Sequence, residues 1–201
     1  MSLTGKIVFW SALCAVLMGT FYEAATSSLL AWRQPVYIVA GFAGIAAMVF
    51  LLCQPLLIKG YVPDLPNAQA RKIHRWFGGG LVVAIVLHVA GLWVTSPPDV
   101  VDALLFRSPT PFSVWGVLAM WAVFAAACVA VLRRRIGPRL WRVLHMILVT
   151  IVVGGSVVHA MRIEGSMGMT SKVILCGLVL GALIKTLVDF RGWRVMPRRR
   201  P

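Results

Sequence analysis

The chain has 201 residues, 60% of them hydrophobic, with a mean hydropathy of +0.87. Soluble domains are only about half apolar, so this composition excludes an ordinary soluble protein. A formal net charge of +14 would suggest nucleic-acid binding in a soluble protein. In a membrane protein, basic residues instead mark the side of the bilayer on which loops lie, and we expect no nucleic-acid partner.

Apolar stretches long enough to cross a lipid bilayer recur along the chain. A helix needs about 20 mostly apolar residues to cross about 30 Å of hydrocarbon. The sequence predicts six such spans, at residues 7–22, 36–57, 74–95, 112–132, 140–161 and 173–190. We therefore predict an all-α, polytopic membrane protein in which a six-transmembrane-helix bundle forms one domain over residues 1–201.

The first span also fits a cleaved signal peptide, because Lys6 precedes the apolar run and small residues follow it at 24–26. We favour a retained helix, because six spans give a consistent distribution of charge. One side collects 16 of the 20 basic residues, in the N-terminus, the second and fourth connections and the tail. The positive-inside rule then predicts that both termini are cytoplasmic, most simply in a bacterial inner membrane.

Four histidines, His74, His88, His145 and His159, are divided between the third and fifth spans. Each pair is separated by 14 residues, which is about 40° short of four helical turns, so both imidazoles of a pair lie on nearly one helix face. They stand about 21 Å apart along the axis. The two spans run in the same direction, so the pattern predicts an inner pair, His74 with His145, and an outer pair, His88 with His159. Two facing imidazoles can bind both axial positions of a haem iron.

A lone histidine in a membrane helix more often bonds a neighbouring backbone group or belongs to a proton relay. A non-redox bundle, either proton-conducting or structural, is therefore the alternative from another class. Because ionisable residues are costly in lipid, four histidines in duplicate spacing favour a common cause, which is haem ligation. Two histidines per level, with no Cys, Asp or Glu expected nearby, fit zinc or copper poorly. Cytochromes of the b561 type distribute their ligands over four helices, unlike this chain.

Residues near the histidines fit the same interpretation. Gly78, Gly79 and Gly155 could leave room for a flat macrocycle, although close helix packing explains each of them equally well. Haem propionates require cations, and the candidates are listed by level: Arg71, Arg75 and Arg142 at the inner haem, and Arg162 at the outer. Each arginine is equally compatible with a charge that marks the membrane interface.

The third and fifth spans resemble those of the ferric reductase-like transmembrane domain on the segments HRWFGGGLVVAIVLH (His74 to His88) and WRVLHMILVTIVVGGSVVH (Trp141 to His159). The resemblance covers essentially the whole chain. This family includes ferric-chelate reductases, the membrane part of NADPH oxidases and the haem-binding membrane subunit of the periplasmic methionine sulfoxide reductase system. It implies transmembrane electron transfer through two b haems, with His74 and His145 as inner ligands and His88 and His159 as outer ligands.

The sequence has no GxGxxG motif and no strand-helix alternation, so we expect no flavin or nicotinamide domain in it. Any flavin or nicotinamide would belong to a separate partner. We therefore expect the membrane cytochrome component of an oxidoreductase that needs a separate electron donor. A cytoplasmic flavoprotein and a quinol are both possible donors. The external acceptor could be a ferric chelate or a periplasmic protein. Chain length favours the methionine sulfoxide reductase-type subunit as an alternative, but His74 is the extra histidine of two-haem members.

Overall fold

The computed structural model describes residues 2–58 and 60–195, with side chains described as far as Asp189. Described residues form seven α-helices and two short 3₁₀ turns, in this order: α1 (Leu3–Ala25), η1 (Ser28–Leu30), α2 (Pro35–Ile58), α3 (Asn67–Thr95), α4 (Pro97–Leu104), α5 (Ser113–Val131), η2 (Leu132–Arg134), α6 (Pro138–Arg162) and α7 (Met169–Val195). A helix satisfies its own backbone hydrogen bonds, which a lipid-exposed segment requires.

Six of the described helices are long and apolar enough to cross a membrane, which confirms the prediction of six spans. The short helix α4 was not predicted, because eight residues are too few to form a membrane span. Prolines at its first two positions and Asp99 in its first turn account for its start. The helix α3 begins at Asn67, so His74 lies about two turns inside the helix rather than at its edge.

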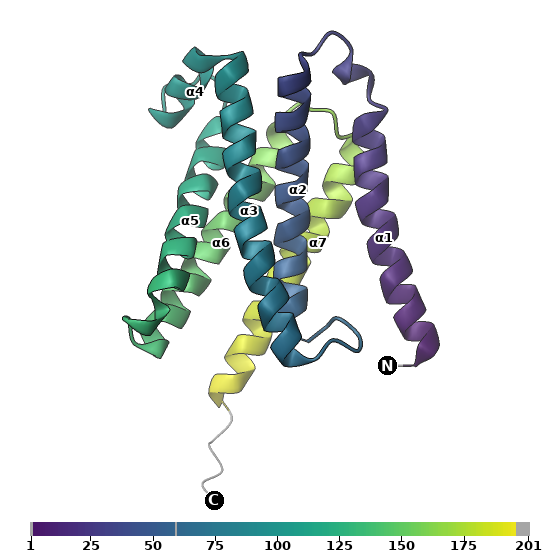
Figure 1. Cartoon of the computed structure of the whole chain (residues 1–201), viewed down its shortest axis with the longest axis vertical. Helices are drawn as coiled ribbons and strands as arrows, with labels where there is room; N and C mark the ends of the chain where they lie inside the picture. The colour runs from purple at the N-terminus through teal and green to yellow at the C-terminus, as the bar shows by residue number, and fades with distance from the viewer. Residues whose placement is uncertain (1, 59, 196–201) are drawn as a thin grey trace, which may run out of the picture.

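Two helical hairpins hold the histidines. Among the described residues, the most extensive helix contacts are between α2 and α3 and between α5 and α6. Figure 1 shows α3 and α6 running in the same direction, from the end of the bundle that carries the start of α1 to the end that carries α4. The helix α7 packs against both hairpins, through α2 and α6, and α1 packs mainly on α7. The parallel course of the two histidine-bearing helices is therefore as the sequence predicted.

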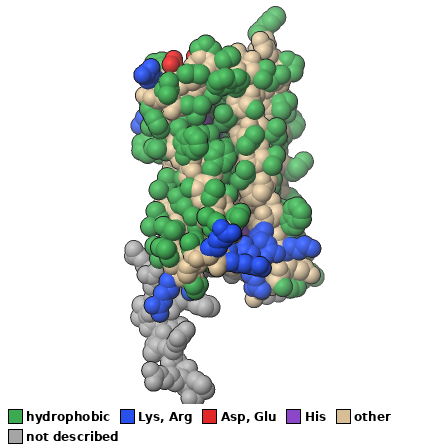
Figure 2. All heavy atoms as spheres, turned by 60° about the vertical axis from the view of Figure 1, so that its left-hand side comes forward, with side chains coloured by type: hydrophobic (Ala, Val, Ile, Leu, Met, Phe, Trp, Pro, Cys, Tyr) green, Lys and Arg blue, Asp and Glu red, His purple; other side chains and the backbone are tan. Residues whose placement is uncertain are grey.

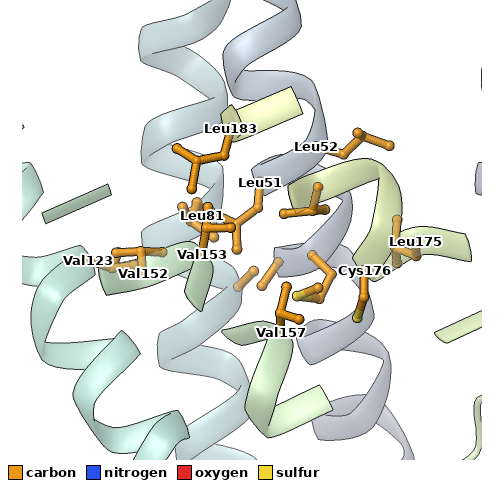
Figure 3. Close-up of a cluster of buried hydrophobic side chains, with 14 of the residues drawn as sticks. Leu51, Leu52, Leu81, Val123, Val152, Val153, Val157, Leu175, Cys176 and Leu183 are labelled. Atoms are coloured by element: carbon orange, nitrogen blue, oxygen red, sulfur yellow. The ribbon is translucent and has the colours of Figure 1, made fainter. Parts of the chain in front are cut away.

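A layer of buried apolar side chains fills the middle of the bundle. Leu51 and Leu52 of α2, Leu81 of α3 and Val152 of α6 meet residues of α5 and α7 in this cluster (Figure 3). Leu81 follows His74 by seven residues and precedes His88 by seven, and Val152 stands in the same relation to His145 and His159. The apolar layer therefore lies halfway between the two histidine levels.

The outer surface has the character expected of a chain in lipid. Many large apolar side chains are exposed along the helices, among them Val83, Val86 and Leu87 of α3 and Ile147 of α6. Figure 2 shows hydrophobic side chains over the middle of one face, with Lys and Arg gathered at the lower end. Wide apolar surfaces of this kind, bordered by basic residues, are typical of membrane-spanning bundles.

Candidate functional site

The outer histidines face each other across the gap between α3 and α6. Their ring centroids lie 6.4 Å apart, and the ring planes are nearly perpendicular, at 83°. An imidazole nitrogen binds a first-row metal ion at about 2 Å, so two imidazoles on opposite sides of one ion have centroids about 6.3 Å apart. The separation of His88 and His159 therefore suits a single metal ion bound between them.

Backbone carbonyls orient both outer imidazoles. His88 Nδ1 lies 2.8 Å from the carbonyl oxygen of Ala40 in α2, and His159 Nδ1 lies 3.0 Å from that of Phe112, just before α5. Because a carbonyl oxygen can only accept, each Nδ1 must donate a proton, which in a neutral ring leaves the lone pair on Nε2. Histidine ligands of metals usually donate their second nitrogen in this way.

A glycine lies beside each outer imidazole. A Cβ atom built on Gly116 of α5 would stand 2.7 Å from His159 Nδ1, and one on Gly44 of α2 would stand 3.1 Å from His88 Nδ1. Each glycine follows the accepting carbonyl residue by four positions, which is about one helical turn. The two hairpins therefore repeat one arrangement, in which a carbonyl holds the imidazole and a glycine one turn later leaves space for it.

The inner histidines are oriented less completely. His74 Nδ1 lies 3.2 Å from the carbonyl oxygen of Gln54 in α2, and His74 and His145 lie within electrostatic range of each other. His145 Nδ1 is buried without a hydrogen-bond partner in the described part of the chain. Its ring instead stacks on Trp141, one turn earlier in α6, with centroids 5.9 Å apart and an interplanar angle of 22°.

Two more polar atoms are buried without a partner at the inner level. They are the indole nitrogen Nε1 of Trp141 and the side-chain oxygen Oε1 of Gln54, and with His145 Nδ1 they make up all such atoms within the described residues. Buried polar atoms normally have a partner, because an unsatisfied one costs about 1–3 kcal/mol. The inner level thus differs from the outer level in leaving polar groups unsatisfied.

The predicted arginines are all exposed at the ends of the two histidine-bearing helices. Arg71 and Arg142 each precede an inner histidine by three residues, so each lies near the face of its helix that carries that histidine. Arg75 follows His74 directly and projects about 100° away from it. Arg142 Nε donates to the carbonyl oxygen of Pro138 at 3.0 Å. At the outer level Arg162 follows His159 by three residues.

The predicted glycines lie in three different surroundings. A Cβ on Gly78 would meet the side chain of Gln54 at 3.4 Å, whereas one on Gly79 would meet nothing within 4 Å. Gly155 is buried against α5, where a Cβ would stand 2.9 Å from the carbonyl oxygen of Trp115. Close packing of α5 on α6 therefore accounts for Gly155.

Sequence reasoning missed the residues that orient the imidazoles, because they lie on α2 and α5 rather than on the histidine-bearing helices. The accepting carbonyls carry no signal in the sequence. Gly44 and Gly116 could be identified only once each histidine-bearing helix is known to pair with the helix before it. Within the described residues, no three His, Cys, Asp or Glu side chains gather into a metal-binding group.

Comparison with known protein families agrees with this architecture. Residues 41–156 match the family described as ferric reductase like transmembrane component. The matched segment contains His74, His88 and His145, and it ends three residues before His159. No curated protein and no solved structure matches the chain. More than half of the chain follows the family model, which, with six spans and paired histidines on parallel helices, places this protein in the ferric reductase-like transmembrane family, whose role is redox chemistry in a membrane.

Proposed function

We propose that this protein transfers electrons across a membrane through two b-type haems, one at each histidine level. The observation that carries the proposal is the outer pair, in which two imidazoles face each other at the separation that one metal ion requires. Members of the family generally bind haem, and the inner pair repeats the outer pair 14 residues away on both helices. A haem bound at each level would supply a site that accepts and releases single electrons.

The donor set fits a porphyrin better than a bare metal ion. A tetrahedral or octahedral site needs four to six protein or water ligands, whereas a haem iron needs only two axial ligands from the protein. The outer level offers two histidines whose Nδ1 atoms are already used by carbonyls. By this assignment His88 and His159 would ligate the outer haem, and His74 and His145 the inner haem.

The chain itself contributes orientation and insulation. The carbonyls of Ala40 and Phe112 fix the ring positions before any iron is bound, which lowers the entropy lost on binding. The buried layer around Leu81 and Val152 separates the two levels and excludes water between them. Electrons would then pass from one level to the other over a distance set by two rigid, parallel helices.

The direction of transfer follows from the charge distribution. By the positive-inside rule, the basic end that holds the inner pair faces the cytoplasm, and electrons would enter there from a flavoprotein or a quinol. Exposed arginines at this end, including Arg133, Arg134 and Arg139, would attract an acidic partner protein. At the other end Arg162 lies near the outer pair, where a ferric chelate or a periplasmic protein would accept the electron.

Electron transfer across a sealed membrane tests the proposal. Purified protein in vesicles that enclose a ferric chelate would receive either a reduced flavin carrier or a quinol from outside, and the ferrous product would be measured with an internal indicator. We expect internal reduction that stops in His88→Ala and His159→Ala vesicles. A colourless protein, or equal reduction by wild type and variants, would refute the proposal.

A further inference from the structure

The unsatisfied polar atoms of the inner level indicate what binds beside His145. Trp141 Nε1 and Gln54 Oε1 are buried without partners, whereas the outer level has no unsatisfied side-chain atom within the described residues. Trp141 stacks on His145, and the backbone of Gln54 accepts the hydrogen bond of His74. The Trp141 ring therefore lies against an inner ligand, whereas the Gln54 side chain reaches Gly78, one turn after His74 toward the middle of α3.

The chemistry of the indole nitrogen restricts the kind of group that can bind it. An indole nitrogen can only donate a hydrogen bond, so its partner must be an acceptor. A group rich in acceptor oxygens suits this position. Haem b carries two carboxylates on one edge of the porphyrin, and a buried carboxylate is stable only when hydrogen bonds or cations compensate its charge.

The position of Trp141 identifies the edge of the porphyrin concerned. Trp141 precedes His145 by four residues, so it lies one turn nearer the Pro138 end of α6. Arg71 and Arg142, each three residues before an inner histidine, are exposed at the same end of the bundle. A carboxylate held by the indole would therefore have cations between itself and the solvent.

We propose that Trp141 binds a propionate carboxylate of the inner haem, with Trp141 Nε1 donating to it. The inference rests on the haem of the proposed function and goes beyond it by assigning a side chain that the arginine candidates left out. The inner haem is then oriented with its carboxylates toward the Pro138 end of α6. His145, whose ring lacks a backbone acceptor, is positioned by the stacked indole instead.

Trp141→Phe is the direct test, because phenylalanine keeps an aromatic ring against His145 and removes only the N–H donor. The matched control is Trp121→Phe, the same change at an exposed position in the middle of α5. Redox titration of both haems and the rate of haem transfer to apomyoglobin are measured in the full-length protein.

We expect Trp141→Phe to lower the midpoint potential of the inner haem, because a carboxylate without its donor stabilises the ferric iron. Haem should leave the inner site about tenfold faster, the effect of losing one hydrogen bond to a charged group. The outer haem and the Trp121→Phe control should be unchanged. An inner potential and a haem-release rate equal to those of wild type would overturn the inference.

Haem dimethyl ester distinguishes a missing hydrogen bond from a disturbed fold, because it lacks both carboxylates. Reconstituted wild type should release the ester at least as fast as Trp141→Phe releases haem, and Trp141→Phe should increase the release rate of the ester much less than that of haem. Additive losses would overturn the inference while leaving the proposed function intact. A wild-type protein that binds no haem at all would instead overturn the proposed function.

Discussion

The outer and inner histidine levels use the same ligands at the same helical spacing, but they differ in how the rings are held. At the outer level both imidazoles donate to backbone carbonyls, and each lies against a glycine. At the inner level only His74 has such a carbonyl, and His145 stacks on Trp141. The outer site is therefore built before a cofactor arrives, whereas the inner site needs the cofactor to satisfy its polar groups.

The difference has an origin in the hairpins. The acceptors for His88 and His74, Ala40 and Gln54, are 14 residues apart on α2, the same spacing as the histidines on α3. In the second hairpin the carbonyl of Phe112 accepts the hydrogen bond of His159. The residue 14 positions later, where an acceptor for His145 would be expected, is Ala126 of α5. No hydrogen bond from His145 to that residue is made in the described part of the chain. Three of the four histidines therefore donate to a backbone carbonyl, and His145, at the level nearer the basic end of the bundle, does not.

Removing an axial histidine should have the largest effect, because it should remove the haem from one level only. We expect His159→Ala to lose the outer haem and keep the inner haem, and His145→Ala to do the opposite, because each iron has no substitute axial histidine at its level. Pyridine haemochrome analysis of each purified variant would give one haem per chain. Loss of both haems in both variants would mean that the levels are not independent.

Replacing the glycines beside the outer imidazoles should reduce haem binding at the outer level alone. In Gly116→Ala the new methyl would stand 2.7 Å from His159 Nδ1, which forces the ring to move, while Gly44→Ala at 3.1 Å from His88 requires a smaller shift. We expect the occupancy of the outer haem to fall by about half or more in Gly116→Ala, because overpacking of this kind costs about 1–3 kcal/mol. The occupancy should fall less in Gly44→Ala. Gly79→Ala, which meets nothing within 4 Å, is the control.

The potentials of the two haems should also differ. A hydrogen bond from Nδ1 to a carbonyl makes the imidazole a stronger donor and stabilises ferric iron. The outer haem has one such bond more than the inner haem, and a hydrogen bond worth about 0.5–1.5 kcal/mol corresponds to about 20–65 mV for one electron. We therefore expect the outer haem to titrate at the lower potential. A redox titration of His159→Ala would give the midpoint potential of the inner haem alone. An outer haem with a midpoint potential above that value would contradict the expected order.

The smallest effect should come from the loop that leads into α3. The Tyr61 hydroxyl donates to the Asp189 carboxylate, and burial together with this hydrogen bond raises the pKa of Tyr61. Tyr61→Phe should cost at most about 1 kcal/mol, measured as a lower Tm of the purified protein, with both haems retained. Because the pKa is raised, this contribution holds below about pH 10 and is lost as the pH rises through the folded pKa. A Tm difference that persists at high pH would argue against it.

The sequence predicted the six spans and the shared direction of the two histidine-bearing helices, because both follow from the length and number of the apolar stretches. The His88–His159 pair needed only a 14-residue spacing and two parallel helices. It could not predict Gly44 and Gly116, since their role depends on which helix lies across the gap. It also could not predict that the indole nitrogen of Trp141 would be buried beside His145, since this depends on how α6 packs in the bundle. The short helix α4 was missed because its signal is eight residues long.

The most direct test of the account is the haem content of the purified wild-type protein, measured by pyridine haemochrome and by visible spectra before and after dithionite. The account predicts two b-type haems per chain, both with the sharp α-band of a six-coordinate, reduced haem that has two histidine ligands. A single haem would contradict the assignment of one haem to each histidine level. A protein that carries no haem when it is made with sufficient haem would contradict the central claim.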